Sequence, residues 1–176
     1  MAFVLCWSLY DKDGKHLYPA RGGRMPYDGA SYEVEERLRW DLLQILERRP
    51  DLRVVALSDG APEMINILQR VTEGVEVEVQ LVDVWHALEY VADACRALGI
   101  DPALELARAK KYLFDHDDGA VQVLRRMQRL RTERRTAKKP VPKLLTDAIR
   151  HFENKLAAGL MDYGRRVENE SRGERD

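Results

Sequence analysis

The apolar positions of this chain recur first with the period of strands and then with the period of helices. Residues 3–10 are rich in β-branched and aromatic residues and predict a strand. A glycine-containing turn follows, and residues 15–20 are expected to form the return strand of a β-hairpin, with Pro19 placing it at an edge. Glycine and proline then predict a loop over residues 21–31. Apolar residues at helical spacing predict a helix over residues 31–48, with Ser31 as its N-cap.

Two further strands follow, and each leads into a helix. The strands are predicted over residues 53–58 and 75–82, and the helices over residues 62–71 and 85–98. The first strand is almost wholly apolar, a pattern typical of a strand covered on both faces. The order hairpin, helix, strand, helix, strand, helix predicts a mixed α/β layer fold with a parallel portion.

The last third of the chain is predicted to be helical. Helices are expected over residues 102–114, 119–136 and 143–163, separated by short breaks that contain glycine or proline. The last of these helices carries a long apolar stripe, and Leu144 and Leu160 are expected on its buried side together with their apolar neighbours. No internal repeat is present.

Length and composition suit a globular protein with a hydrophobic core. Of the 176 residues, 45% are hydrophobic and 34% are charged. The predicted elements divide the chain into an α/β part over 1–100, a basic helical segment over 101–166 and a disordered polar tail over 167–176. No apolar run reaches the roughly 18–20 residues of a membrane span, and the start lacks signal-peptide features, so we expect a cytoplasmic protein without a membrane partner. Cys6 and Cys95 have no metal-ligand spacing and are expected to be buried free thiols.

The net charge of −1 conceals an uneven distribution of charge. Residues 31–100 carry 14 acidic and 7 basic side chains, whereas residues 124–143 carry 9 basic side chains and a single acidic one, Glu133. Such a basic segment is a candidate contact for the phosphate backbone of DNA, and the alternative is a solvated helix face followed by a loop. The candidate DNA-binding residues are Arg125, Arg126, Arg129, Arg131, Arg134, Arg135, Lys138 and Lys139.

Acidic residues follow both of the later strands. Asp59 comes directly after strand 53–58 and Asp83 directly after strand 75–82, and His86 stands three residues later. In sheets with parallel strands, sites form at the carboxyl ends of the strands, and hard cations such as Mg²⁺ prefer carboxylate ligands. Each aspartate could equally cap the helix that follows it, and two carboxylates are too few for a two-metal phosphodiester site.

At these residues the sequence resembles a known family. The segments LSDGAPEMINIL and VQLVDVWHALEYVADACRALG are similar to the core of bacterial insertion-sequence transposases of the DDE class, which have an RNase H-like fold. The shared motifs are an Asp-Gly-Ala triplet, here Asp59 to Ala61, and an Asp-x-x-His element, here Asp83 to His86, followed by Ala87 and Glu89. The order of the flanking segments agrees as well, so the resemblance extends over residues 1–166.

The resemblance implies metal-dependent cutting of DNA and strand transfer, with Mg²⁺ ions held by three carboxylates. Asp59 matches the second carboxylate and is thus the expected catalytic and metal-binding residue. Asp83 and His86 match the Asp-x-x-His element, which lies close to the site, and no chemical role is assigned to these two residues. The family's first aspartate lies on a strand preceding the one that begins here, and its third carboxylate lies in a glycine-rich segment after MDYGRR. Neither is matched in this chain, and the glutamates of the tail do not stand in the family's motif.

The sequence therefore predicts a transposase fragment, truncated at both ends, that is catalytically inactive by itself and does not bind Mg²⁺ tightly. The missing first strand also predicts an exposed edge at residues 3–10 that is prone to pair with another chain. One alternative is a non-catalytic DNA-binding or oligomerising module, which would associate with itself or with an intact transposase. Another is a small metal-dependent α/β hydrolase that uses Asp59, Asp83 and His86 as a single-metal site.

Overall fold

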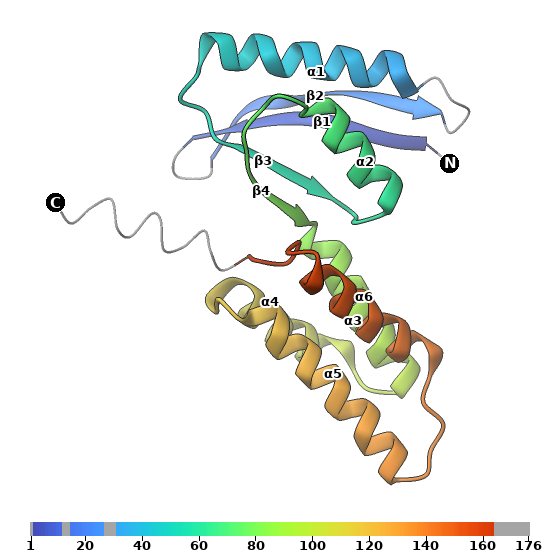
Figure 1. Cartoon of the computed structure of the whole chain (residues 1–176). Coiled ribbons are helices and arrows are strands. Elements are labelled where there is room, and N and C mark those ends of the chain that lie inside the picture. Colours follow the sequence, from blue (N-terminus) through green and yellow to red (C-terminus); the bar gives the residue numbers. More distant parts are fainter. Residues whose placement is uncertain (1, 12–14, 27–30, 164–176) are drawn as a thin grey trace, which may run out of the picture. The chain divides into compact units, whose positions relative to one another are not determined.

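The computed structural model describes residues 2–11, 15–26 and 31–163, and the fold is mixed α/β (Figure 1). Its helices and strands follow the predicted order. The chain divides into two compact units, which are described separately below. The first unit consists of Met1–Ala56 and Pro62–Val79, and the second of Leu57–Ala61 and Gln80–Asp176.

The first unit begins with the predicted hairpin. Strand β1 (Ala2–Tyr10) pairs antiparallel with β2 (His16–Pro26), and the register places Ala2 opposite Pro26. The loop predicted from residue 21 onward is therefore wrong as far as Pro26. The glycines and prolines did not end the strand because β1 offers nine residues of backbone, and pairing along its whole length satisfies the polar groups of both strands.

Helices α1 (Ser31–Arg48) and α2 (Pro62–Val71) complete the first unit, and both have the predicted bounds. The indole Nε1 of Trp7 donates a hydrogen bond of 2.9 Å to the backbone oxygen of Leu38, which joins β1 to α1. The guanidinium of Arg70 donates two hydrogen bonds to the buried carboxylate of Glu35, at 2.7 and 2.9 Å, which joins α2 to α1. These contacts hold the hairpin and the two helices together.

Strands β3 (Val54–Ser58) and β4 (Val77–Val82) form a second, parallel pair, and both contribute residues to each unit. Among the described residues, this sheet and the β1–β2 hairpin are separate two-stranded sheets. The prediction that β3 is covered on both faces is wrong, because Leu57 is 56% exposed. Alternate residues of a strand point to opposite faces, and the buried set is Val54, Ala56 and Ser58.

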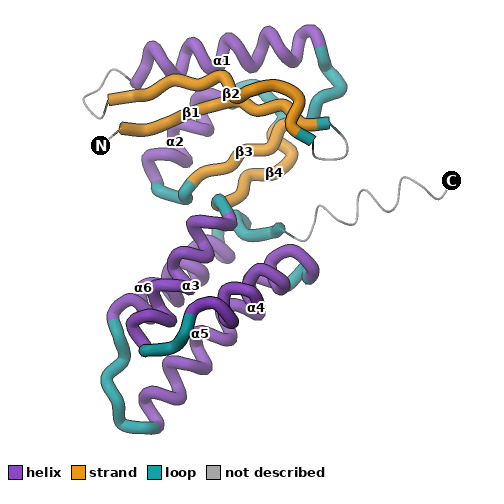
Figure 2. The backbone as a smooth tube through the Cα atoms, turned by 180° about the vertical axis from the view of Figure 1, so that it is seen from behind, coloured by secondary structure: helices purple, strands orange, loops and turns teal. Residues whose placement is uncertain are grey.

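Within its described residues, the second unit contains four helices, which are labelled α3 to α6 and drawn in purple in Figure 2. They are α3 (Val84–Leu98), α4 (Pro102–Asp115), α5 (Gly119–Thr136) and α6 (Lys143–Ala157). Side chains from all four helices form one hydrophobic core, in which Leu113, Leu145 and Phe152 are completely buried. Helix α3, which the sequence placed in the α/β part, thus packs with the helices that follow it.

Helix α6 ends at Ala157, six residues before the predicted end. Gly159 has a left-handed backbone with φ of +69°, and the N–H of Leu160 donates back to the oxygen of Lys155 at 2.9 Å. This geometry ends a helix, and glycine adopts it without the strain of a β-carbon. Leu160 is buried beyond the helix as expected, whereas Leu144 is 47% exposed, contrary to the prediction.

The two cysteines differ in their surroundings. Cys95 is a buried free thiol, as predicted, and burial raises its pKa. Cys6 is a free thiol but exposed, so the prediction of burial is wrong for it, because its strand has one face open. None of the described helices is both long enough and apolar enough to cross a membrane. The tail predicted to be disordered lies outside the described residues.

Candidate functional site

Asp59 lies in the turn that follows β3. Its Oδ1 accepts a hydrogen bond of 2.8 Å from the N–H of Ala61, and the Ser58 hydroxyl accepts one of 3.1 Å from the N–H of Gly60. Gly60 has φ of +80°, and a β-carbon there would lie 2.9 Å from Cγ2 of Val82. The turn therefore requires glycine, and it holds Asp59 exposed at the end of the strand.

Asp83 caps helix α3 and lies at the same end of the sheet as Asp59. Its Oδ1 accepts a hydrogen bond of 3.0 Å from the N–H of Trp85, the geometry of an N-cap. Its own N–H donates to the backbone oxygen of Ser58 at 2.6 Å, which joins the carboxyl ends of β3 and β4. The structure thus brings the two aspartates to one sheet end, as the sequence predicted. Asp83 caps the following helix as in the alternative reading, whereas Asp59 bonds within the turn before α2 begins.

His86 makes its contacts along α3 and with α6. Its Nδ1 lies 3.2 Å from a carboxylate oxygen of Glu89, and its ring meets those of Tyr90 and His151 edge-on, at 5.3 and 5.8 Å between centroids. None of these contacts within the described residues involves Asp59 or Asp83. The structure therefore places His86 in an aromatic cluster, and the predicted grouping of one histidine with two aspartates is not seen among its contacts.

His151 is a member of this cluster that the sequence analysis missed. Its ring stacks on Tyr90 at 4.0 Å between centroids, and its Nε2 is buried without a hydrogen-bond partner among the described residues. Burial, together with the nearby His86 and Lys155, lowers the pKa of His151 to about 4, so the ring is neutral at pH 7. Its position beside Phe152 on the apolar stripe of α6 is the sequence signal that could have identified it.

The end of α6 and the residues after it support the turn at Asp59. The ammonium of Lys155 donates a hydrogen bond to the backbone oxygen of Gly60. The hydroxyl of Tyr163 donates one of 2.9 Å to the backbone oxygen of Val82, and burial, reinforced by the charge of Asp83, raises the pKa of this hydroxyl. Neither residue was predicted, because nothing local in the sequence relates them to the strand ends.

The described residues do not fit a magnesium site. Within residues 2–11, 15–26 and 31–163, no three histidine, cysteine or acidic side chains are grouped so that they could hold a metal ion. Asp59 and Asp83 each use one oxygen for the backbone, and the ammonium of Lys155 already bonds to the residue next to Asp59. A fixed positive charge at this position opposes a second cation, so no metal-dependent step follows from this geometry.

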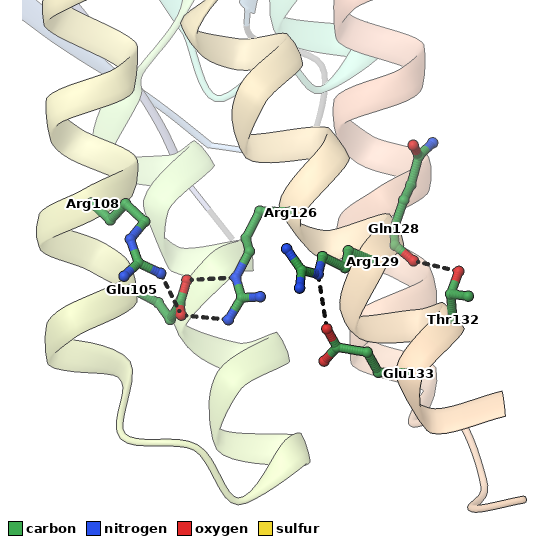
Figure 3. A network of polar contacts seen from close by, with 7 residues as sticks. All are labelled: Glu105, Arg108, Arg126, Gln128, Arg129, Thr132 and Glu133. Atoms are coloured by element: carbon green, nitrogen blue, oxygen red, sulfur yellow. Dashed lines mark hydrogen bonds and ion pairs between the residues drawn. The ribbon is translucent and has the colours of Figure 1, made fainter. Parts of the chain in front are cut away.

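The predicted DNA-binding residues lie on α5 and in the segment after it, and the structure divides them by their contacts. Arg126 donates two hydrogen bonds to the carboxylate of Glu105, at 2.8 and 3.2 Å, and Arg108 donates a third at 3.1 Å (Figure 3). Glu105 is only 7% exposed. The hydrogen bond from Arg126 outweighs this burial and lowers the pKa of Glu105. Arg126 therefore joins α5 to α4 and has a structural partner.

Most of the other basic residues of this segment are exposed to solvent. Arg129 pairs with Glu133 at 3.0 Å on the exposed side of α5, as Figure 3 shows, and Arg134 donates to the backbone oxygen of Pro140. Exposed side chains without an ion pair among the described residues are those of Arg125, Arg135, Lys138 and Lys139, and Arg131 is half-buried. The structure thus leaves an exposed, predominantly cationic surface on α5 and the segment after it.

Comparisons of this chain with known protein families, with curated proteins and with solved structures gave no match.

Proposed function

We propose that this chain is part of a DDE-type transposase and that it binds DNA through α5 without cutting it. The resemblance in the Asp-Gly-Ala and Asp-x-x-His motifs supports the family. The order of the elements is compatible with this family, and so is the position of Asp59 and Asp83 at one end of the β3–β4 sheet.

The observation that carries DNA binding is the way in which Arg126 and Glu105 orient α5. This pair, in which the Glu105 carboxylate is buried, fixes one side of α5 against α4, and Arg125 and Arg135 remain exposed on the same helix. Lys138 and Lys139 continue the exposed charge beyond its end. Arginine and lysine side chains arranged in this way bind phosphates and release counterions, which makes affinity independent of base sequence and strongly dependent on salt.

In this proposal, Asp59 is one carboxylate of an incomplete site. The described residues do not assemble a metal site around it, and a phosphodiester-cutting centre needs several converging carboxylates. We therefore propose binding and not cleavage as the activity of this chain. Cleavage of DNA by the purified chain that requires Mg²⁺ and is lost in Asp59→Ala would favour the single-metal hydrolase instead.

The test is a salt titration of binding to a fluorescent DNA duplex of arbitrary sequence. The slope of log affinity against log salt changes by about 0.9 for each phosphate contact that is lost. We expect the triple variant Arg125→Gln, Arg135→Gln, Lys139→Gln to bind more weakly and with a shallower slope.

The matched control replaces three exposed basic residues of the first unit, in the variant Lys15→Gln, Arg37→Gln, Arg48→Gln. Both variants remove three positive charges, so a general effect of net charge would weaken both to the same extent. Equal binding by the two variants would show that the surface of α5 is a solvated helix face and would refute the proposal.

A further inference from the structure

The two strands of the hairpin differ in how their edges are protected. Strand β1, AFVLCWSLY, carries no charged residue and no proline. Strand β2, HLYPARGGRMP, carries two arginines and two prolines. Charged residues and prolines are the features by which edge strands avoid pairing with other polypeptides. The outer edge of β2 therefore has these features, and that of β1 lacks them.

The irregularities of the hairpin also fall on β2. Trp7 is opposite Arg21 and Leu9 is opposite Tyr18, so two residue steps along β1 correspond to three along β2. Tyr10 is opposite His16, so the next single step along β1 corresponds to two along β2. Extra residues bend the strand that contains them and interrupt its pairing, so β1 keeps the regular spacing that a further strand requires.

The second edge of β1 has no partner strand among the described residues. An unpaired edge presents a row of backbone donors and acceptors that another strand can pair with. The side chains of Cys6, Ser8 and Tyr10 are exposed on one face of β1. Neither charge nor proline thus opposes the approach of another strand to this edge.

We propose that two copies of this chain associate through β1, which pairs antiparallel with β1 of the second copy. A two-fold axis places the same segment on both sides, and an uncharged segment meets no like charge in its copy. The net charge of −1 adds little repulsion between copies. Strand β3 is also uncharged, but with five residues against nine it would form about half as many hydrogen bonds. This inference is independent of the proposed DNA binding.

The register of this pairing is testable, because Cys6 is the middle residue of Ala2–Tyr10. When β1 overlaps fully with its copy, Cys6 lies opposite the same residue of the second copy. Residues directly opposite in antiparallel strands have Cα atoms about 4.5–5.5 Å apart, which is within the range of roughly 4.4–6.8 Å that a disulfide requires. A mild oxidant such as diamide, which accepts two electrons and two protons from the two thiols, would therefore join the copies by one disulfide.

Two measurements on the full chain test the proposal. Under reducing conditions at roughly 100 µM protein, sedimentation equilibrium is expected to give a mass of about twice the 20.3 kDa of one chain. After treatment with diamide, a dimer that reductant dissolves is expected on denaturing gels. This dimer should be lost in Cys6→Ser and retained in Cys95→Ser, because Cys95 is buried.

A charge substitution tests the interface without oxidation. Cys6→Lys places two ammonium groups opposite each other across the two-fold axis, and we expect the dimer dissociation constant to rise about tenfold. Ala107→Lys, on the exposed side of α4, adds the same charge elsewhere and should leave the dimer intact. A monomeric wild-type chain, equal association of the two lysine variants, or a disulfide that survives Cys6→Ser would each overturn the proposal.

Discussion

The buried carboxylate of Glu105 offers the sharpest test of how the second unit is held together. It accepts two hydrogen bonds from Arg126 and one from Arg108, at distances from 2.8 to 3.2 Å. Glu105→Gln retains the size of the side chain but removes its charge, and it turns an N–H group toward two guanidinium groups. The substitution thus breaks the connection between α4 and α5 with little change in packing volume.

The expected loss of stability follows from the burial of the three groups. Breaking a fully buried ion pair costs about 3–5 kcal/mol, whereas exposed pairs contribute about 0–1 kcal/mol. Glu105 is almost fully buried, but the side chains of Arg126 and Arg108 are 31% and 43% exposed, so water compensates part of the loss. We therefore expect Glu105→Gln to lower the free energy of unfolding by about 2 kcal/mol.

Urea denaturation followed by circular dichroism measures this difference. With a slope of about 2 kcal/mol per molar urea, the midpoint should fall by about 1 M. The matched control is Glu133→Gln, which removes the exposed pair with Arg129 on the same helix and should lower the free energy of unfolding by less than about 1 kcal/mol. Equal midpoints for the two glutamine variants would refute the assignment of a structural role to Arg126.

The dependence on pH provides a second check on the same pair. Because the hydrogen bond from Arg126 lowers the pKa of Glu105 in the folded state below its usual value of 4.5, the folded state binds fewer protons than the unfolded state at acidic pH. The stabilisation is therefore fully present above about pH 4.5 and is lost as the pH falls through the lower folded-state pKa. The stability difference between the wild type and Glu105→Gln should narrow over that acidic range.

Two further substitutions test the region around the strand ends. Gly60→Ala should lower the free energy of unfolding by about 2–3 kcal/mol, because the β-carbon would lie too close to Val82 in a backbone that alanine adopts with strain. The matched control Gly74→Ala has a similar φ of +78°, but its β-carbon would make only an ordinary contact of 3.9 Å with Arg39, so it should lower the free energy of unfolding by about 1 kcal/mol. His151 has a folded-state pKa of about 4 against 6.5, so the unfolded state binds more protons between these values, and stability should fall by about 1–2 kcal/mol as the pH drops from 6.5 to 4. This part of the pH dependence should disappear in His151→Phe, and an NMR titration that gives His151 a pKa near 6.5 would contradict its burial.

Helix bounds were predicted well where local chemistry sets them. Helix α3 begins after its N-cap, Asp83, and ends before Gly99, whose φ is +71°. Caps and left-handed glycines act within a few residues, so they can be read from the sequence. Strand β2 was predicted too short, because its length depends on pairing with β1. Helix α6 was predicted too long. The end of α6 depends on Gly159 and on the burial of Leu160 outside the helix.

The candidate site was predictable only in part, for the same reason. The position of Asp59 and Asp83 at the ends of successive strands is a local property of the sequence, and the hydrogen bond between Ser58 and Asp83 brings those ends together. The contact of Lys155 with Gly60 joins residues 95 apart in the sequence, and that of Tyr163 with Val82 joins residues 81 apart. No pattern in either segment indicates these partners.

The sequence alone therefore determined the elements of this protein, their order and the places where charge accumulates, since these follow from periodicity, capping and composition. The tertiary structure decided what each charged group does. It buried Glu105 and thereby made Arg126 a structural residue, while Arg125 and Arg135 on the same helix remained exposed. Burial removes water from a charge and forces it to find a partner, and which charges are buried is settled only when the helices pack.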